Sequence, residues 1–149
     1  MITTEVNVSG LKELAGRMLT LQEADSLLRE ISTTMLAETT DRIHKFGLNA
    51  DGNPIGSYSD GYLKLREKNG LGSDRKVILR FNADMEKNYG IVPISDTEYG
   101  LGFTNPTEGQ KADWVENTYQ KNGKIYALTD SELDQVRAIV AEFVANTFK

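Results

Sequence analysis

Cysteine is absent from the chain, which excludes disulfides, zinc ribbons and thiol catalysis and fits a reducing compartment. Long apolar runs are also absent, so no stretch of the sequence is suited to span a membrane. The N-terminal sequence MITTEVNV lacks the charged and then apolar pattern of a signal peptide. We therefore expect a soluble cytoplasmic product.

Catalytic motifs are scarce as well. The single histidine, His44, cannot form an i, i+4 metal-binding pair, and no Gly-x-Ser-x-Gly motif supplies a nucleophile for it to activate. His44 lies near the C-terminal end of an expected helix, so we interpret it as a cation that binds the last backbone carbonyls of that helix. Gly70-Leu71-Gly72 lacks the third glycine of a dinucleotide fingerprint, because Arg75 occupies that position. The sequence predicts no enzyme, no cofactor and no metal site.

The nearest approach to a metal motif is an acidic loop that loosely imitates the spacing of a calcium-binding EF-hand. Its oxygen-bearing residues are Asn49, Asp51, Asn53 and Asp60. Pro54 stands at the sixth position, where the EF-hand loop needs glycine for a sharp turn. We therefore expect Asx hydrogen bonds within a turn instead of a bound cation.

Charge is unevenly distributed along the chain, which has 149 residues and a formal net charge of −5. Residues 1–41 carry a net charge of −4, residues 42–87 carry +3 and residues 88–149 carry −4. The overall acidity argues mildly against a protein whose main task is to bind nucleic acid. The asymmetry has two interpretations, namely incidental solvated faces or electrostatic complementarity between neighbouring copies in an assembly.

Two long amphipathic helices are predicted. The first runs from Thr20 to Gly47, because Thr20 and Glu23 form a capping box and apolar residues then recur with a helical period. Gly47 stands where helices commonly end in a left-handed residue. The second helix begins at the T-D-S-E capping box of Thr129 and continues to Val144. Shorter helical segments are expected after Ser9 and over residues 111–119.

Four segments alternate in polarity or are rich in β-forming residues, and each is predicted as a strand. They are residues 3–8, 76–81, 88–94 and 97–103. The last two flank Ser95-Asp96 as a hairpin, and a turn or short helix is expected at NADMEK. No βαβ unit repeats, so we expect a single α+β domain over residues 1–149. The two long amphipathic helices should pack on one face of a small antiparallel sheet, with long polar loops.

The composition changes sharply after the first long helix. The segment GLNADGNPIGSYSDGYLKLREKNGLGSDR holds six of the thirteen glycines and is predicted to be a long loop, in which Tyr58, Tyr62 and Leu65 anchor a helical turn. Loops longer than about 12–15 residues are usually functional or disordered, so this one is a candidate contact surface. A second polar segment, residues 104–124, and the residues just after it present Trp114, Tyr119 and Tyr126 either as a satellite core or as interface residues.

Six segments follow one another in a recognisable order. They are ETTDRIHKFG, DGNPIGSYSDGYLKLR, VILRFNADMEKNYGIV, EYGLGFTN, KADW and YALTDSELDQV, and they extend over residues 38–136. In order and spacing they resemble the phage virion-morphogenesis proteins, the small head–tail joining or tail-completion proteins of tailed bacteriophages.

This resemblance implies a non-enzymatic structural protein of a tailed bacteriophage or prophage, a subunit of the neck or tail-completion assembly that joins head and tail. The implied partners are connector or adaptor subunits, tail-tube or terminator subunits, and further copies of the chain in an oligomeric ring. No cofactor, membrane or specific nucleic-acid sequence is implied. The implied location is the virion, and the host bacterial cytoplasm during assembly.

If copies form a ring, the basic region 42–87 of one copy is expected to face an acidic helix of the next. The interface candidates are Tyr58, Tyr62, Lys64, Arg66, Lys68, Arg75, Trp114 and Tyr119. Two alternatives stay open. One is a small partner-binding adaptor that uses an exposed sheet edge. The other is a metal-dependent hydrolase that acts through the carboxylates Asp51, Asp60 and Asp84.

Overall fold

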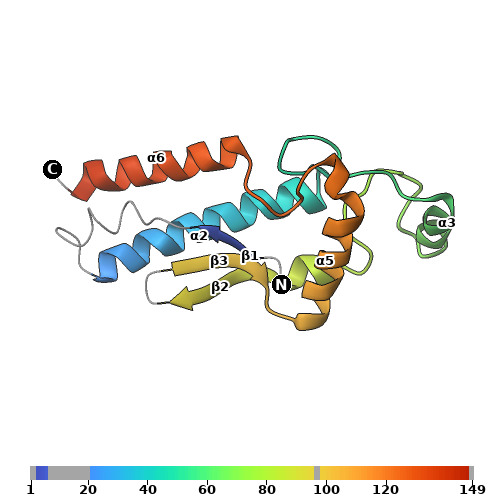
Figure 1. The fold of residues 1–149 in the computed structure, drawn as a ribbon, viewed down its shortest axis with the longest axis horizontal. Coiled ribbons are helices and arrows are strands. Elements are labelled where there is room, and N and C mark those ends of the chain that lie inside the picture. The colour runs from blue at the N-terminus through green and yellow to red at the C-terminus, as the bar shows by residue number, and fades with distance from the viewer. Residues whose placement is uncertain (1–2, 7–20, 96–97, 148–149) are drawn as a thin grey trace.

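The computed structural model describes residues 3–6, 21–95 and 98–147. Its elements are β1 (Thr3–Val6), α2 (Leu21–His44), α3 (Asp60–Lys68), α4 (Asp84–Asn88), β2 (Tyr89–Ser95), β3 (Glu98–Phe103), α5 (Pro106–Tyr119), the 3-10 helix η1 (Gln120–Asn122) and α6 (Asp130–Thr147). They form an α+β fold, which confirms the predicted class (Figure 1). The expected helix after Ser9 and the capping box at Thr20 lie outside the described residues.

A three-stranded antiparallel sheet forms one layer, in the order β1-β3-β2. The predicted hairpin is confirmed, since β2 and β3 pair in antiparallel register with Tyr89 opposite Phe103. The side chains of Tyr99, Leu101 and Phe103 alternate along β3 and are all buried. Because successive side chains of a strand point to opposite faces, these three share the face that packs on α2.

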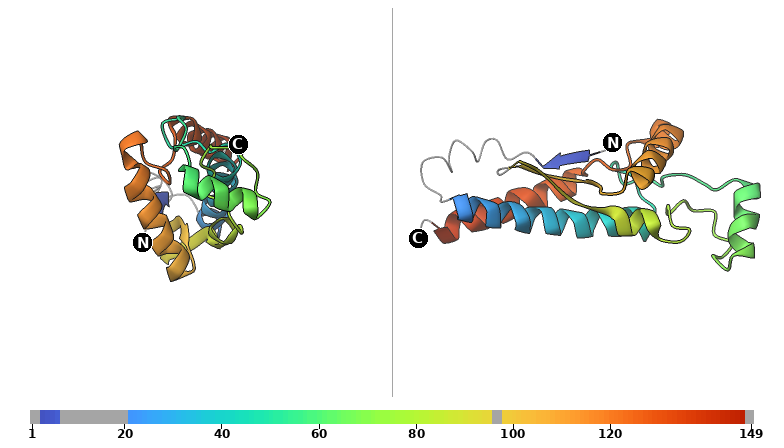
Figure 2. Two further views of the ribbon diagram at one scale, coloured as in Figure 1. Left: turned by 90° about the vertical axis from the view of Figure 1, so that its right-hand side faces the viewer. Right: turned by 90° about the horizontal axis from the view of Figure 1, so that it is seen from below.

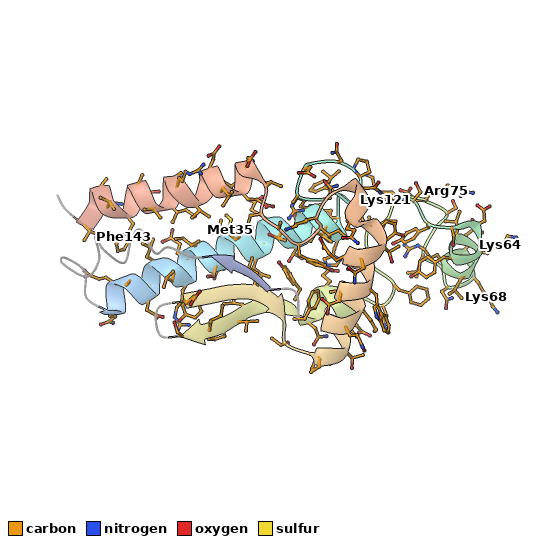
Figure 3. The ribbon with its side chains drawn as sticks, in the orientation of Figure 1. Met35, Lys64, Lys68, Arg75, Lys121 and Phe143 are labelled. Carbon is orange, nitrogen blue, oxygen red and sulfur yellow. The ribbon has the colours of Figure 1, made fainter. Side chains whose placement is uncertain are left out.

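The two long helices run antiparallel in adjacent layers. Helix α2 lies directly on the sheet, and α6 packs on α2 (Figure 1). Met35 of α2 is completely buried, and Phe143 of α6 packs against the same core, as the side-chain view shows (Figure 3). Each fully buried side chain of this size contributes about 1.5–3 kcal/mol to stability. The core therefore runs through both layers.

Gly47 ends α2 as predicted. Its φ of +63° is left-handed, its amide donates to the Ile43 carbonyl at 3.2 Å, and the amide of Leu48 donates to the Arg42 carbonyl at 2.9 Å. A Cβ atom at Gly47 would lie 2.5 Å from the Val77 carbonyl oxygen. Glycine is therefore needed here both for the backbone conformation and for the close approach of a distant segment.

The predicted strand at residues 76–81 is wrong. Only an isolated bridge between Ser57 and Lys76 forms there, and the following residues are irregular. Leu79 adopts a left-handed φ of +49°, which turns the chain away from an extended path. The amide of Ile78 donates to the hydroxyl of Tyr58, so a side chain takes the place of a strand partner. Val77 is fully buried, Ile78 and Leu79 are half-buried and Phe81 is exposed, so the β-rich composition does not reflect strand pairing here.

The capping box at the start of α6 is confirmed. Thr129 Oγ1 accepts a hydrogen bond from the amide of Glu132 at 3.0 Å, and the Glu132 carboxylate accepts one from the amide of Thr129 at 2.7 Å. The same carboxylate binds Nε of Arg42 at 2.8 Å, and both side chains are more than nine-tenths buried. The cap of α6 is thereby joined to the end of α2.

Arg42 also donates to three backbone carbonyls. Its Nη1 lies 3.2 Å from the oxygen of Leu48 and 3.0 Å from that of Ile125, and its Nη2 lies 2.8 Å from that of Ala127. These carbonyls belong to the turn after α2 and to the segment that leads into α6. One guanidinium therefore connects three parts of the chain.

We predict that Arg42→Met destabilises the protein by about 3–5 kcal/mol, because the Glu132 carboxylate would stay buried without its cation. The free energy of unfolding, measured by urea denaturation, tests this value. Arg137→Met is the matched control, since it removes the exposed Arg137–Asp134 pair and should change stability by no more than about 1 kcal/mol. Equal losses in the two variants would contradict the proposed importance of Arg42.

Candidate functional site

Residues 56–81 leave the body as a projecting arm, with α3 at its outer end (Figure 2). Helix α3 begins at Asp60, where Ser59 caps it by accepting a hydrogen bond from the amide of Tyr62. The prediction of a helical turn within a long loop is thereby confirmed, but Leu65 does not anchor it, since this side chain is 46% exposed and Leu63 is the buried leucine of α3. The two limbs of the arm are joined by hydrogen bonds from the amide of Tyr58 to the Arg75 carbonyl and from that of Val77 to the Gly56 carbonyl.

The side chain of Arg66 holds the inside of the arm together. It is only 4% exposed, and its guanidinium lies 4.6 Å from the ring centroid of Tyr58. Its Nη1 donates to the Arg80 carbonyl at 2.5 Å and its Nη2 to the Leu71 carbonyl at 3.4 Å. Arg66 therefore ties α3 to the limb that returns to the body.

His44 fixes the base of the arm. Its side chain is buried, and Nδ1 lies 3.2 Å from the Ile78 carbonyl oxygen, so Nδ1 carries the proton and donates. Its Nε2 is buried and has no hydrogen-bond partner among the described residues. Burial lowers the pKa of His44 below its usual 6.5, because the charged imidazolium would lose its hydration. The prediction that His44 satisfies the last carbonyls of its helix is wrong, since its Nδ1 binds the Ile78 carbonyl in the returning limb of the arm.

A groove of about 910 Å³ separates the arm from α5. Its arm side includes the rings of Tyr58, Tyr62 and Phe81, and its α5 side includes Val115 and Tyr119. The centroids of Tyr58 and Tyr62 lie 5.0 Å apart, and those of Tyr62 and Phe81 lie 6.2 Å apart. Tyr62 and Phe81 remain 37% and 38% exposed, so the groove offers aromatic surface to a partner.

Two charged side chains of α5 also line the groove. Lys111 Nζ lies 2.7 Å from Oε1 of Glu108, and this contact raises the pKa of Lys111. The Glu108 side chain is almost fully buried, and its Oε2 has no hydrogen-bond partner in the described part of the chain. The groove therefore combines aromatic walls with the partly exposed ammonium of Lys111, whose carboxylate partner is buried.

The outer end of the arm is basic. Lys64 and Lys68 point away from the body, and neither forms an ion pair with any residue that the structure describes (Figure 3). Arg75 lies nearby and binds the Asp60 carboxylate at 2.6 Å, with both side chains exposed. Residues 56–81 contain six Lys/Arg and three Asp/Glu, a net charge of +3.

Six of the eight interface candidates belong to the arm. Tyr62, Lys64, Lys68 and Arg75 are exposed there, which suits a contact surface. Tyr58 and Arg66 are buried, because the ring and the guanidinium pack on each other, so they support the arm and do not form its surface. These two residues are removed from the set of direct contacts.

The remaining two candidates lie on α5. Tyr119 is half-buried and faces the groove, where it packs against Gly56 so closely that a Cβ atom there would lie 2.6 Å from its ring. Trp114 is 62% exposed and does not line the groove. The satellite-core interpretation of Trp114 is therefore wrong, whereas nearby Tyr126 belongs to the main core.

Phe81 and Glu108 are groove residues that the sequence analysis missed. Phe81 was assigned to a strand, and the left-handed Leu79 that redirects it has no local sequence signal. Glu108 is the third residue of α5 after the cap Asn105, a position where a carboxylate is ordinary. Only the tertiary structure shows that its side chain is buried beside the arm.

The acidic residues considered for metal binding have ordinary structural roles. Asn49 Oδ1 accepts hydrogen bonds from the amides of Asp51 and Asn53, each at 3.0 Å, which confirms the predicted Asx turn. Asp60 starts α3 and Asp84 starts α4, at separate places in the fold. Within the described residues, no group of three or more His, Asp or Glu side chains is placed to hold a metal ion.

Comparison with known protein families, curated proteins and solved structures gives no significant match. Among the helices that the structure describes, none combines the length and apolar character needed to cross a membrane. The arm and its groove are the candidate functional site on geometry alone.

We predict that Arg66→Met loosens the arm without unfolding the body. The variant loses both carbonyl contacts and the stacking on Tyr58, so amide hydrogen exchange over residues 58–81 should become faster while α2 and β3 stay protected. Lys64→Met, which removes an exposed lysine of the same helix, is the control and should exchange like the original chain. Unchanged exchange in Arg66→Met would show that other contacts hold the arm.

We further predict that His44 makes stability depend on pH. The folded-state pKa is lowered, so the unfolded state binds more protons, and the free energy of unfolding increases with pH in this range. The His44 contribution is complete above pH 6.5 and is lost as the pH falls through the folded-state pKa. His44→Asn keeps an N–H donor near the Ile78 carbonyl but cannot titrate.

Urea denaturation between pH 5 and pH 8 should therefore give a shallower slope of stability against pH for His44→Asn than for the original chain. Other groups titrate in both proteins alike, so the difference between the two slopes isolates His44. Parallel slopes would contradict the assignment of a depressed pKa to this residue.

Proposed function

We propose that this chain is a non-enzymatic structural protein of a tailed bacteriophage or prophage, a subunit of the neck or tail-completion assembly that joins head and tail. Its partners would be connector or adaptor subunits on one side and tail-tube or terminator subunits on the other. It would act in the virion, after assembly in the host cytoplasm.

The arm is the observation that carries this proposal. Its outer helix packs little against the body, yet its limbs are fixed by Arg66 and Tyr58. It exposes aromatic rings beside a groove, and at its outer end two lysines that form no ion pair with the described residues. A contact surface that is already ordered in the free protein lowers the entropy cost of binding a partner. An ordered projecting arm gives a small subunit additional surface with which to contact several neighbours.

The order of elements adds support from the sequence. The segments that resemble the virion-morphogenesis proteins fall on the end of α2, the arm, α4 with β2, β3, α5 and the start of α6. They therefore include residues 56–66 and 77–81 of the arm, with most of α3, and parts of the elements that hold it. The uneven charge of the chain fits the same function, because subunits that repeat around an axis meet through different and complementary surfaces.

We predict that removing this gene from the phage or prophage that encodes it leaves heads and tails unjoined. Negative-stain electron microscopy of lysates should show the two structures separately, and expression of the intact chain from a plasmid should restore joined particles. Mass spectrometry of purified virions should also detect the chain at a constant ratio to the other structural proteins. Normal virions without the gene would contradict the proposal.

A further inference from the structure

We infer that the arm and groove are the docking site for a second copy of this chain, and that they receive the acidic layer formed by α2 and α6. This inference rests on the proposed assembly function, because it names which surfaces of neighbouring subunits meet. It assigns the arm first to contacts between like subunits, which build the assembly that joins head and tail.

Charge complementarity identifies the occupant. The arm carries a net charge of +3, whereas α2 has five Asp/Glu against two Arg and α6 has four Asp/Glu against one Arg. Four exposed carboxylates of these helices form no ion pair with any described residue. They are Glu30, Glu38, Asp130 and Glu142. The acidic layer and the basic arm therefore each expose charges of opposite sign that a neighbouring copy can pair with.

A second argument comes from the position of the two surfaces. The molecule is elongated, with the arm at one end and the C-terminal end of α6 at the other (Figure 2). The arm of one molecule therefore does not reach the distal carboxylate Glu142 of its own α6. The contact between copies therefore joins two different surfaces, and if it is repeated head to tail as a heterologous contact it closes into a ring when the rotation permits.

The groove adds apolar contact area to the charged surface of the arm. A stable interface buries about 800 Å² on each partner, more than a few exposed lysines provide. The half-exposed rings of Tyr62 and Phe81 extend the basic surface into the groove. On the acidic layer, Leu133 of α6 is 37% exposed and offers apolar surface next to the carboxylates. Both surfaces thus pair an apolar area with a charged one.

The charge argument is tested by light scattering of the purified protein over a range of concentration and salt. The original chain should form a discrete oligomer that dissociates as salt rises, since exposed charges are screened beyond about 10 Å at 0.1 M. Lys64→Glu with Lys68→Glu should weaken association at least about tenfold. Lys45→Glu with Lys124→Glu makes the same charge change at two exposed lysines outside the arm and should leave association unchanged.

A heterologous contact also predicts rescue by mixing. The Lys64→Glu, Lys68→Glu variant should associate again with a Glu38→Lys, Glu142→Lys variant, because each then offers one surface that matches the other. Either variant alone should remain dissociated. If the mixture stays dissociated while both variants are folded, the assignment of these surfaces to each other is wrong.

The groove is tested by filling it. Thr118 lines the groove on the exposed side of α5, so Thr118→Trp should block docking and lower association about tenfold without disturbing the core. Asn117→Trp places the same side chain on the adjacent exposed position, outside the groove, and is the matched control. Equal association of the two variants would remove the groove from the interface.

The possible results separate this inference from the function on which it rests. A chain that stays monomeric at all concentrations and salts overturns the docking of a second copy, as does an oligomer that the arm and groove variants do not affect. In either case unjoined heads and tails after gene removal would still support the proposed function. Normal virions without the gene, together with arm-dependent oligomers, would instead keep the docking site and reject the joining function.

Discussion

The buried guanidinium of Arg42 is the interaction on which the rest of the structure depends. It binds the Glu132 carboxylate that caps α6 and the carbonyls of Leu48, Ile125 and Ala127. A buried charge is costly unless its partners satisfy it, so these contacts form together or the arrangement is lost. The position of α6 on α2 is thereby coupled to the course of the turn that follows α2.

The same end of α2 also determines where the arm leaves the body. Two residues after Arg42, His44 donates to the Ile78 carbonyl. The Val77 carbonyl oxygen lies so close to Gly47 that it would clash with the Cβ atom of any other residue there. The returning limb of the arm therefore rests on the last turn of α2. Within six residues the chain fixes α6 on one side and the arm on the other, so the acidic layer and the basic arm have a defined relation in each subunit.

Features governed by neighbours in the sequence were predictable. The capping box of α6 and the stop at Gly47 need only a few adjacent residues, and the β2–β3 hairpin needs only one turn. The α+β class followed from the order of these elements. The helical turn within the long loop also followed from local spacing. Its outward projection did not, because that depends on contacts between the arm and residues distant in the sequence.

Features governed by distant contacts were not predictable. Arg66 and Lys68 look alike in a basic segment, yet one stacks on Tyr58 and the other is exposed, because helical spacing places them on different faces of α3. Residues 76–81 have strand-like composition, but the partner of Ile78 is the hydroxyl of Tyr58, twenty residues away. His44 was predicted to act as a cation at the helix end, because the sequence does not show that the arm covers its side chain. In each case the missing information was the position of the other limb of the arm.

The internal contacts of the arm explain why it can serve as a docking surface at all. A loop that orders only on binding would lose conformational entropy at that moment, and this cost would be subtracted from the modest gain of exposed charge pairs. The contact between Arg66 and Tyr58 orders the arm when the protein folds. Tyr62 and the exposed lysines therefore need no further ordering when a partner binds. The buried residues Arg66 and Tyr58 thus fix the positions of the exposed residues that would contact a partner.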